Sequence, residues 1–301
     1  MRALVLAAMM LAAAVPVWAA DRPGLVQEYT AIESDTLPDI AMRNDLGYVE
    51  LRAANPEVDP WLPGAGTRIV LPSLHILPAA PMRGIVINLA EQRLYFFPPD
   101  QPVQTYPIGV PAVGTDLRTG TTQIIAKRPN PTWYPPPSVR AEDPELPLSI
   151  APGPDNPLGE FALYTGWTDI VIHGTNHPYG IGRRVSHGCF RLYPEDIERL
   201  YKQVAVGTTV TVVDQLAKLA WIDGELYLEV HPSLAQADEI EVSGHFTQDL
   251  IAGLDRLILD AATPYPERID WHIVDQVARE RSGIATPIFK RGLAASLAGP
   301  G

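Results

Sequence analysis

The feature that most restricts the fold of this chain is a series of short runs in which apolar residues recur with a period of two. The runs cover residues 84–89, 93–97, 103–110, 121–127, 161–164, 170–173 and 208–213. A period of two is that of a β-strand. The chain also contains 31 prolines, which are poorly tolerated inside helices. We therefore predict a mostly β domain rather than a helical bundle.

A proline-rich stretch divides this series of predicted strands. Residues 129–157 contain ten prolines, too many for any regular element. Loops of this length are usually lids over a site or disordered linkers. Because Trp133 and Tyr134 lie within the stretch, we predict an ordered cover over the functional site, in which these two aromatic residues contact the substrate.

Cys189 is the only cysteine, so it has no partner for an intramolecular disulfide. A single thiol is either buried and inert or kept for its reactivity. Its neighbours favour reactivity, because Ser186 and His187 are polar and Gly188 permits a close approach of the backbone. We predict that Cys189 is a nucleophile.

A cysteine nucleophile needs a base or a positive charge nearby, because its ordinary pKa of about 8.5 leaves little thiolate at pH 7. His173 ends a predicted strand, whereas His187 lies in a turn two residues before the thiol and could serve as a hydrogen-bonding prop. The backbone N–H groups of Gly188 and Cys189 are the natural oxyanion hole. Arg191 could bind a substrate carboxylate through two hydrogen bonds, or it could be a solvated surface arginine.

A zinc site is a competing interpretation of the same region. Its candidate ligands are His173, His177, His187 and Cys189, with three nitrogens and one sulfur. The spacing of His173 and His177 suits a helix, but Gly174 and Pro178 disfavour a helix there. The usual CxxC and HExxH motifs are also absent from the sequence. We therefore expect neither a metal nor any other cofactor.

Several short motifs occur in order along the chain. They are Thr119-Gly120-Thr121, Lys127 to Trp133, Pro152-Gly153-Pro154, Asn156 to Gly159, Ile172 to Asn176, Gly180-Ile181-Gly182 and Val185 to Leu192. In these motifs the sequence resembles the L,D-transpeptidases, the YkuD-domain family, and most resembles the ErfK/YbiS/YcfS/YnhG group. The resemblance implies that residues 82–214 form the catalytic domain, a YkuD-like β-sandwich with a short helix.

The resemblance also implies roles for individual residues. Cys189 would be the nucleophile and His173 the base, with the imidazole oriented by the backbone carbonyl of Gly174. We group Ser186, His187 and Gly188 with Gly174 as the residues that orient this pair or bind the oxyanion.

The implied substrate is a peptidoglycan stem tetrapeptide. Cys189 would attack its meso-diaminopimelate carbonyl, release D-alanine and form a thioester. The acyl group would pass to another stem peptide, giving a 3-3 cross-link, or to the C-terminal lysine of a Braun-type lipoprotein. Carbapenems would acylate the same thiol. Attack by water would instead give an L,D-carboxypeptidase or a lipoprotein-releasing hydrolase, and an inactive thiol would leave a non-catalytic peptidoglycan-binding protein.

The first residues have the composition of a secretory signal. Arg2 precedes an alanine-rich apolar run, and cleavage after Ala19 would place Val17 and Ala19 at the small-residue positions. We assign residues 1–19 to a signal peptide and expect a periplasmic protein, in contact with the membrane only through that segment before cleavage. A net charge of −12 without a basic run argues against a nucleic-acid partner.

Two further units flank the predicted catalytic domain. Residues 27–73 predict a strand, a helix capped by Thr36, a second helix and a closing strand. This pattern resembles a small α/β LysM module, which implies binding of glycans that contain N-acetylglucosamine; a spacer that binds nothing is the alternative. Residues 215–301 predict an α/β subdomain with a hairpin around Asp223-Gly224 and amphipathic helices near 245–261 and 269–282. We expect the first of these helices, which carries Leu250, to pack against the main domain.

Overall fold

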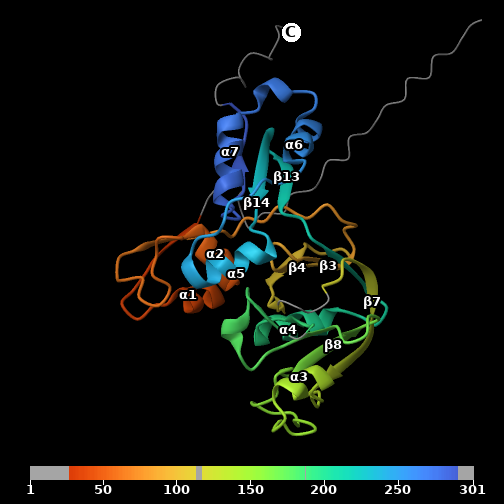
Figure 1. Cartoon of the computed structure of the whole chain (residues 1–301). Helices are drawn as coiled ribbons and strands as arrows, with labels where there is room; N and C mark the ends of the chain where they lie inside the picture. Colours follow the sequence, from red (N-terminus) through yellow and green to blue (C-terminus); the bar gives the residue numbers. More distant parts are fainter. Residues whose placement is uncertain (1–26, 113–116, 187, 291–301) are drawn as a thin grey trace, which may run out of the picture.

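The computed structural model describes residues 27–112, 117–186 and 188–290. The predicted signal peptide at 1–19 and the predicted prop His187 lie outside these residues. Figure 1 shows a central β domain flanked by an N-terminal unit, in red and orange, and a C-terminal unit, in blue. No helix in the described ranges is long and apolar enough to cross a membrane.

Eight strands form one curled mixed sheet in the central domain. In spatial order they are β11 (Phe190–Arg191), β9 (Val171–His173), β8 (Phe161–Thr165), β7 (Gly120–Pro129), β12 (Thr209–Val213), β3 (Gly84–Asn88), β4 (Arg93–Phe97) and β5 (Gln104–Pro107). Two short strands, β6 (Val110–Pro111) and β10 (Arg184–Ser186), form a separate parallel pair. Except for β10 and β11, these strands overlap the predicted runs, and the prediction of a mostly β domain is confirmed.

The core of this domain lies inside the curl of the sheet. Phe96 of β4 and Phe190 of β11 come from opposite ends of the sheet and belong to one buried cluster. Ile197 and Leu200 of α4 (Pro194–Gln203) complete it, with Pro194 in the first turn, where a helix accepts proline. The two layers expected of a β-sandwich are therefore the two halves of a single sheet, closed by the predicted short helix.

The proline-rich loop contains a helix that the sequence analysis did not predict. α3 (Pro137–Glu142) begins within a run of prolines, because proline is compatible with the first helical turn. Trp133 and Ile150 close the base of the loop with backbone hydrogen bonds of 2.9 and 2.8 Å. The buried amide of Asn156 donates to the carbonyls of Pro131 and Ile150. These contacts order the loop, as expected for a cover.

The N-terminal unit has the predicted order of elements. They are β1 (Gln27–Thr30), α1 (Leu37–Arg43), α2 (Tyr48–Ala54) and β2 (Arg68–Leu71). β1 and β2 pair antiparallel. The Thr36 hydroxyl accepts a hydrogen bond from the Asp39 N–H at 3.2 Å and so caps α1 as predicted. The assignment to a LysM-like module stays a prediction.

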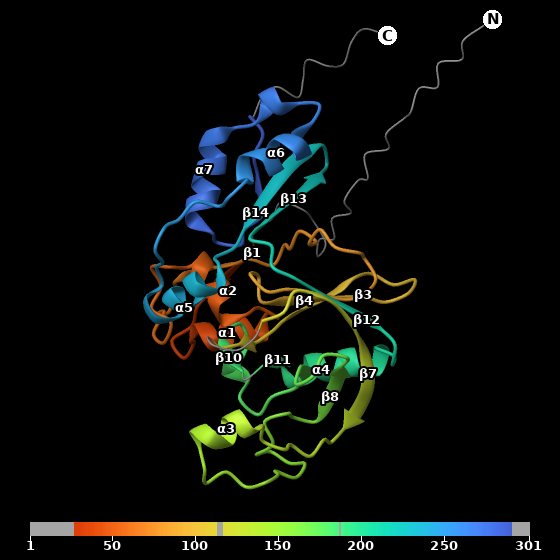
Figure 2. The same cartoon turned by 45° about the vertical axis from the view of Figure 1, so that its right-hand side comes forward.

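The C-terminal unit follows β12 through a short connection (Figure 2). Its sheet contains β13 (Ala217–Ile222), β14 (Glu225–Val230) and β15 (Thr286–Pro287), and its helices are α5 (Leu234–Ser243), α6 (Leu254–Ala262) and α7 (Trp271–Glu280). Two single 3-10 turns, η1 (Pro178–Gly180) in the central domain and η2 (Pro266–Arg268) here, complete the described elements. The predicted hairpin is present, and Asp223 and Gly224 have the positive φ angles that its two-residue turn requires.

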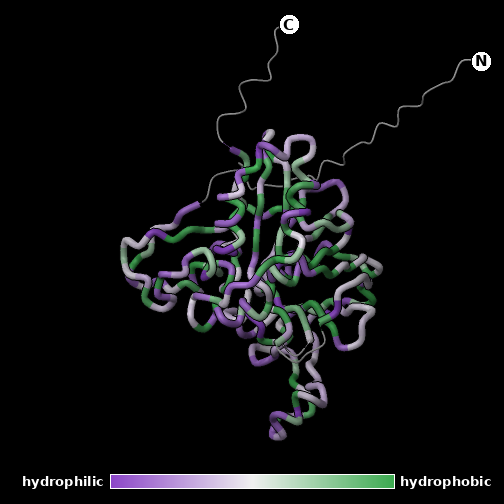
Figure 3. The backbone as a smooth tube through the Cα atoms, turned by 45° about the horizontal axis from the view of Figure 1, so that its top comes forward, coloured by the Kyte–Doolittle hydropathy of each residue, from purple (hydrophilic) through white to green (hydrophobic). Residues whose placement is uncertain are grey.

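The predicted C-terminal helices are partly wrong. The helix expected at 245–261 begins only at Leu254, because Gly253 before it has a left-handed φ of 74°. Leu250, expected in the core, is 98% exposed. Ile258 of α6 packs with Leu228 of the unit's own sheet rather than on the main domain. Each of the three units has a main buried cluster. Figure 3 shows the hydrophobic segments of the chain, in green, passing through the body of the molecule.

Helix α5, which the sequence analysis did not predict, joins the three units. Figure 1 shows it beside α2, and its Ala237 belongs to the buried cluster of the N-terminal unit. Its Asp238 and Glu241 form ion pairs of 2.6 Å with Arg184 and Arg183 of the central domain. Arg184 begins β10, the strand that leads into the turn before Cys189. α5 therefore braces the segment that carries the thiol.

We expect Asp238→Asn to lower the free energy of unfolding by about 1–2 kcal/mol, since Arg184 would lose a charged hydrogen-bond partner. The Arg184 side chain is only 10% exposed, so water replaces that partner poorly. The matched control is Glu198→Gln, which breaks an exposed ion pair with Lys202 and should cost less than about 0.5 kcal/mol. Urea unfolding measures both losses, and equal losses would contradict the bracing role of the Asp238 pair.

Candidate active site

Strands β9 and β11 bring together the residues on which the functional prediction rests. They are parallel neighbours at one end of the curled sheet, and their register pairs Phe190 with Ile172 and Arg191 with His173. Phe190 and Ile172 point into the core. Side chains alternate along a strand, so His173, Arg191 and Cys189, which directly precedes β11, lie toward the other face. The sheet therefore places the imidazole and the thiol on one side.

The imidazole of His173 is buried and oriented by the next residue. Its Nδ1 lies 2.5 Å from the carbonyl oxygen of Gly174, the contact that the family resemblance implies. A carbonyl only accepts, so Nδ1 carries the proton and Nε2 is left as an acceptor. Burial, followed by the positive charge of Arg191, lowers the pKa of His173 to about 3. His173 is therefore a neutral base at pH 7.

The thiol of Cys189 is neutral as well in the resting protein. Its Sγ lies 3.7 Å from the carbonyl oxygen of Asp169, which accepts a weak S–H hydrogen bond. Burial raises the pKa of Cys189, a backbone hydrogen bond from Val171 and the charge of Arg191 lower it, and the charge of Asp169 raises it further. The raised pKa of the thiol and the lowered pKa of His173 together disfavour a preformed thiolate–imidazolium pair.

The turn before the thiol depends on two of the predicted orienting residues. Gly188 has a φ of 114°, which side chains rarely adopt, and an added Cβ would lie 3.4 Å from the Asp169 carbonyl oxygen. Ser186 is buried, and its hydroxyl donates to the Cys189 carbonyl. The oxyanion role of the Gly188 and Cys189 amides stays a prediction, as does the role of His187, which lies outside the described residues.

Arg191 is not a solvated surface arginine. Its backbone N–H and carbonyl pair with Gly109 at 2.9 and 2.8 Å. Its side-chain Nε is buried without a hydrogen-bond partner, and burial lowers the pKa of the guanidinium. The guanidinium also acts on the pKa of both His173 and Cys189. It is a poorly solvated cation at the site, which suits the predicted binding of an anionic substrate group.

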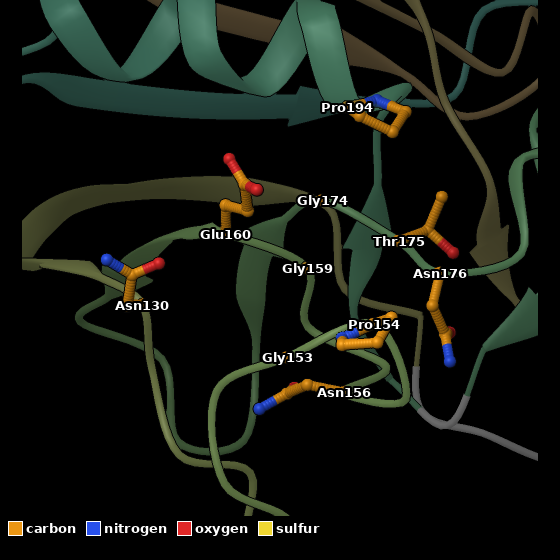
Figure 4. Close-up of a pocket in the computed structure, with 10 residues that line it drawn as sticks. All are labelled: Asn130, Gly153, Pro154, Asn156, Gly159, Glu160, Gly174, Thr175, Asn176 and Pro194. Atoms are coloured by element: carbon orange, nitrogen blue, oxygen red, sulfur yellow. The ribbon is translucent and has the colours of Figure 1, made fainter.

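Two cavities adjoin the residues next to the thiol and the imidazole. The larger has a volume of about 550 Å³ and is lined by Arg118, Tyr134 to Ser138, Thr168 to Ile170 and Gly188. The smaller has a volume of about 370 Å³, and Gly174 and Thr175 form part of its wall. Figure 4 shows this second cavity between the loop residues Gly153 to Asn156 and Pro194 at the start of α4. The proline-rich loop therefore contributes to both walls.

The two aromatic residues predicted to contact the substrate are placed differently. Tyr134 is 71% exposed and lines the larger cavity. Trp133 lines neither of these cavities, and its backbone pairs with that of Ile150 at the base of the loop. Tyr134 is thus better placed than Trp133 to contact a substrate in the larger cavity.

Three charged residues of the cavity walls were missed by the sequence analysis. Arg118 and Asp169 line the larger cavity, and Glu160 lines the smaller one. Each stands one or two residues before a strand of the sheet, namely β7, β9 and β8. Arg118 and Asp169 stand at the edge of the sheet beside the thiol, whereas Glu160 stands at the opposite edge, because β8 runs antiparallel to β7 and β9. Their place just before a strand is the one signal that could have indicated them.

The zinc interpretation finds no geometric support. Across residues 27–112, 117–186 and 188–290, the group of His, Cys, Asp and Glu that could hold a metal is His75, Glu91 and Glu229. It does not include His173, His177 or Cys189. In this buried group the ammonium of Lys218 already lies 2.8 Å from Glu91 and 2.7 Å from Glu229. Lys218 thus neutralises the carboxylates and occupies the space that a metal would need.

The neutral thiol gives a testable pH profile. We expect the rate of Cys189 alkylation by iodoacetamide to keep rising above pH 8.5, because the pKa of this half-buried thiol is raised and the thiolate is the reacting form. Cys189 is the only cysteine, so alkylation of the intact protein reports on this thiol alone. A small free thiol measured in parallel should level off at lower pH. A plateau of the protein below pH 7 would instead indicate a preformed ion pair with His173.

Comparison with known proteins identifies the class to which this fold and site belong. The family model of the L,D-transpeptidase catalytic domain (YkuD) matches residues 82–212. The chain is 41% identical over 223 residues to the "Probable L,D-transpeptidase YcfS" of Escherichia coli K12, with 69% of each chain covered. It is 38% identical over 270 residues to the "Probable L,D-transpeptidase YbiS" of the same strain, with 87% of this chain and 86% of that protein covered.

Among solved structures, the catalytic domain of the E. faecium L,D-transpeptidase is similar to 45% of this chain over its whole length, at 22% identity and a TM-score of 0.36. The family assignment rests on the sequence relatives. The chain belongs to the L,D-transpeptidase family.

Proposed function

We propose that the protein is a cysteine-dependent L,D-transpeptidase that acts on peptidoglycan stem tetrapeptides through a thioester. The observation that carries the proposal is the placement of Cys189 and His173 toward one face of adjacent strands, with the Nδ1 proton of His173 held by Gly174. That hydrogen bond leaves Nε2 as the only ring nitrogen that can take up a proton.

The proposed first half-reaction starts from the neutral pair. Nε2 of His173 takes the thiol proton as the Cys189 sulfur attacks the meso-diaminopimelate carbonyl, and two backbone N–H groups bind the oxyanion. The imidazolium then gives its proton to the departing amine. The C–N bond breaks, D-alanine leaves, and a thioester remains.

The second half-reaction transfers the acyl group to an amine. His173 deprotonates the incoming amine, which attacks the thioester and releases the thiol. A stem-peptide amine would give a 3-3 cross-link, and the lysine of a Braun-type lipoprotein would give a protein–wall bond. Water in place of the amine would give a carboxypeptidase or a lipoprotein-releasing hydrolase.

We also propose that the N-terminal unit binds glycan, as its LysM-like order of elements implies. The connection from β1 to α1 meets the connection from α2 to β2, since the Ala31 N–H donates a backbone hydrogen bond of 2.8 Å to the Thr67 carbonyl. These connections expose Ile32, Trp61 and Leu62, at 55%, 54% and 77%. An exposed tryptophan is a suitable platform for a sugar ring. Trp61→Ala should weaken retention on purified peptidoglycan about tenfold, and Trp271→Ala, at a 41% exposed tryptophan of the C-terminal unit, should not. Equal retention of both variants would leave the unit a spacer.

The proposed site of action is the periplasm, after removal of residues 1–19. The support is the signal-like composition of that segment.

The proposed function is tested by product analysis. The protein without residues 1–19 is incubated with disaccharide tetrapeptide alone, and then with a lipoprotein peptide that ends in lysine. A cross-linked dimer with loss of one D-alanine supports peptide cross-linking, and a peptide–muropeptide adduct supports lipoprotein attachment. Tripeptide alone would show that water is the acceptor. No change in the tetrapeptide, together with binding to peptidoglycan, would favour the non-catalytic alternative.

A further inference from the structure

We propose that Asp169 is a specificity-determining residue that binds a primary ammonium group of the peptide substrate next to the sulfur of Cys189. The inference rests on the proposed acyl transfer and adds to it a residue and the substrate group that this residue recognises. Asp169 lies in the turn between β8 and β9 and lines the larger cavity together with Tyr134 and Gly188.

The backbone of Asp169 is fixed against the cysteine turn. Its φ of 65° lies in the left-handed region, which aspartate and asparagine adopt more readily than most residues. Its carbonyl oxygen accepts the Cys189 thiol at 3.7 Å and would lie 3.4 Å from a Cβ on Gly188. The side chain, in contrast, is exposed. The backbone contact with the nucleophile thus leaves the Asp169 carboxylate free to line the cavity.

No ion pair between described residues involves the Asp169 carboxylate, which shares its cavity with the cation Arg118. In contrast, Asp238 and Glu241 of α5 pair with Arg184 and Arg183, and Asp196 of α4 pairs with Arg199. Without a partner the carboxylate opposes catalysis, because its charge raises the pKa of Cys189. A bound cation would remove this effect and make the thiol more acidic when the substrate arrives.

The other titratable groups near the thiol, namely Arg191, His173 and Tyr164, cannot bind an ammonium group through a negative charge. Arg191 is a cation and would repel an ammonium group. His173 is neutral and donates its Nδ1 proton to Gly174. Burial raises the pKa of Tyr164, which keeps its hydroxyl neutral. Among these groups Asp169 alone is anionic.

The substrates of the proposed reaction carry the matching group. The acyl donor is attacked at a meso-diaminopimelate carbonyl, and the side chain of that residue ends in a free amino group. The acceptor is itself an amine that approaches the same carbon. Either is an ammonium ion at neutral pH until His173 or solvent removes a proton. A carboxylate on the wall of the cavity that reaches Gly188 therefore recognises chemistry that the reaction already requires.

Two thiol reagents separate ammonium binding from turnover. Aminoethyl methanethiosulfonate carries an ammonium group, and hydroxyethyl methanethiosulfonate is a neutral reagent of the same size. Relative to a small free thiol, we expect the wild-type protein to prefer the cationic reagent about tenfold. Asp169→Asn should lose this preference. It should also react roughly threefold faster with the neutral reagent at pH 7, because removal of the Asp169 charge removes one of the causes that raise the pKa of the thiol.

Asp223→Asn is the matched control. It makes the same substitution at another left-handed aspartate, with a φ of 48° in the turn between β13 and β14, and should change neither rate. An Asp169→Asn variant that keeps the wild-type reagent preference would overturn the proposal. A merely structural role of Asp169 would slow both reagents alike and would not accelerate the neutral one.

Substrate kinetics then identify which ammonium group is bound. If it belongs to the donor, Asp169→Asn raises the KM for thioester formation about tenfold and has no effect on a donor analogue that lacks the side-chain amine. If it belongs to the acceptor, only the aminolysis step slows. Equal losses for donors with and without the amine, with aminolysis unchanged, would overturn the proposal. If the wild-type protein forms no thioester, the acyl-transfer function fails, and the reagent preference still decides whether Asp169 binds ammonium.

Discussion

Cys189→Ala is expected to lower kcat/KM for acyl transfer at least about a thousandfold, because the variant cannot form the thioester. The measurement is the rate of D-alanine release from disaccharide tetrapeptide. Since the chain has a single cysteine, loss of the titratable thiol confirms the substitution directly.

Cys189→Ser serves as the isosteric control. Its hydroxyl keeps the shape of the site but is far less acidic than the thiol, so it should be nearly as inactive as the alanine variant. Unchanged urea unfolding of both variants would exclude loss of the fold. Retention of more than about a tenth of the wild-type rate in either variant would contradict a cysteine nucleophile.

His173→Gln is expected to lower kcat by about 10²–10⁴-fold, the usual contribution of a general acid–base. Glutamine fills most of the volume of this buried side chain but cannot exchange a proton with the thiol. D-alanine release and alkylation at pH 7 should both fall, since the neutral imidazole is needed to remove the thiol proton.

The control for this substitution is His177→Gln. His177 is exposed, follows His173 by four residues and belongs to no described group that could hold a metal. This variant should keep the wild-type rate. Equal losses in the two histidine variants would contradict the assignment of His173 as the base and would reopen the zinc interpretation.

The central domain was largely predictable from local sequence. Strands such as β4 coincide with their predicted runs because a period of two, bounded by proline and glycine, leaves few alternatives. The closure of the sheet was not predictable. Phe96 and Phe190, from opposite ends of the sheet, share one buried cluster only through long-range pairing of strands, which periodicity does not encode.

The main errors of the prediction from sequence were two missed helices, α3 and α5. α3 lies in a proline-rich segment because its prolines fall in the first turn, the one place where a helix does not need their N–H. α5 was missed because it is buried on one side by the N-terminal unit and pairs on another with Arg183 and Arg184. Its residues therefore lack a single apolar stripe.

The residues of the candidate site also divide into those that local sequence predicts and those that only the fold reveals. Cys189 and His173 could be named from their residue types and neighbours, whereas Asp169 could not, because a single acidic residue in a turn is ordinary. Its significance comes from the left-handed backbone and the contact with the thiol, both of which exist only in the folded chain.

The three units are tied together in ways that fix the geometry around the thiol. The backbone N–H groups of Tyr48 and Val49, at the start of α2, donate to the carbonyls of Ile181 and Gly182 at 3.1 Å. Arg183, next in sequence, lies 3.7 Å from the Tyr48 ring centroid. A glycan strand held on the N-terminal unit would thus be kept at a constant distance from the site.

The most direct test of the account is the mass of the intact protein after brief incubation with tetrapeptide and rapid acid quenching. We expect an added mass equal to the disaccharide tripeptide acyl group, located on Cys189 by peptide mapping and lost on incubation with an amine. A peptide adduct on another residue, or product formation by the Cys189→Ala variant, would contradict it.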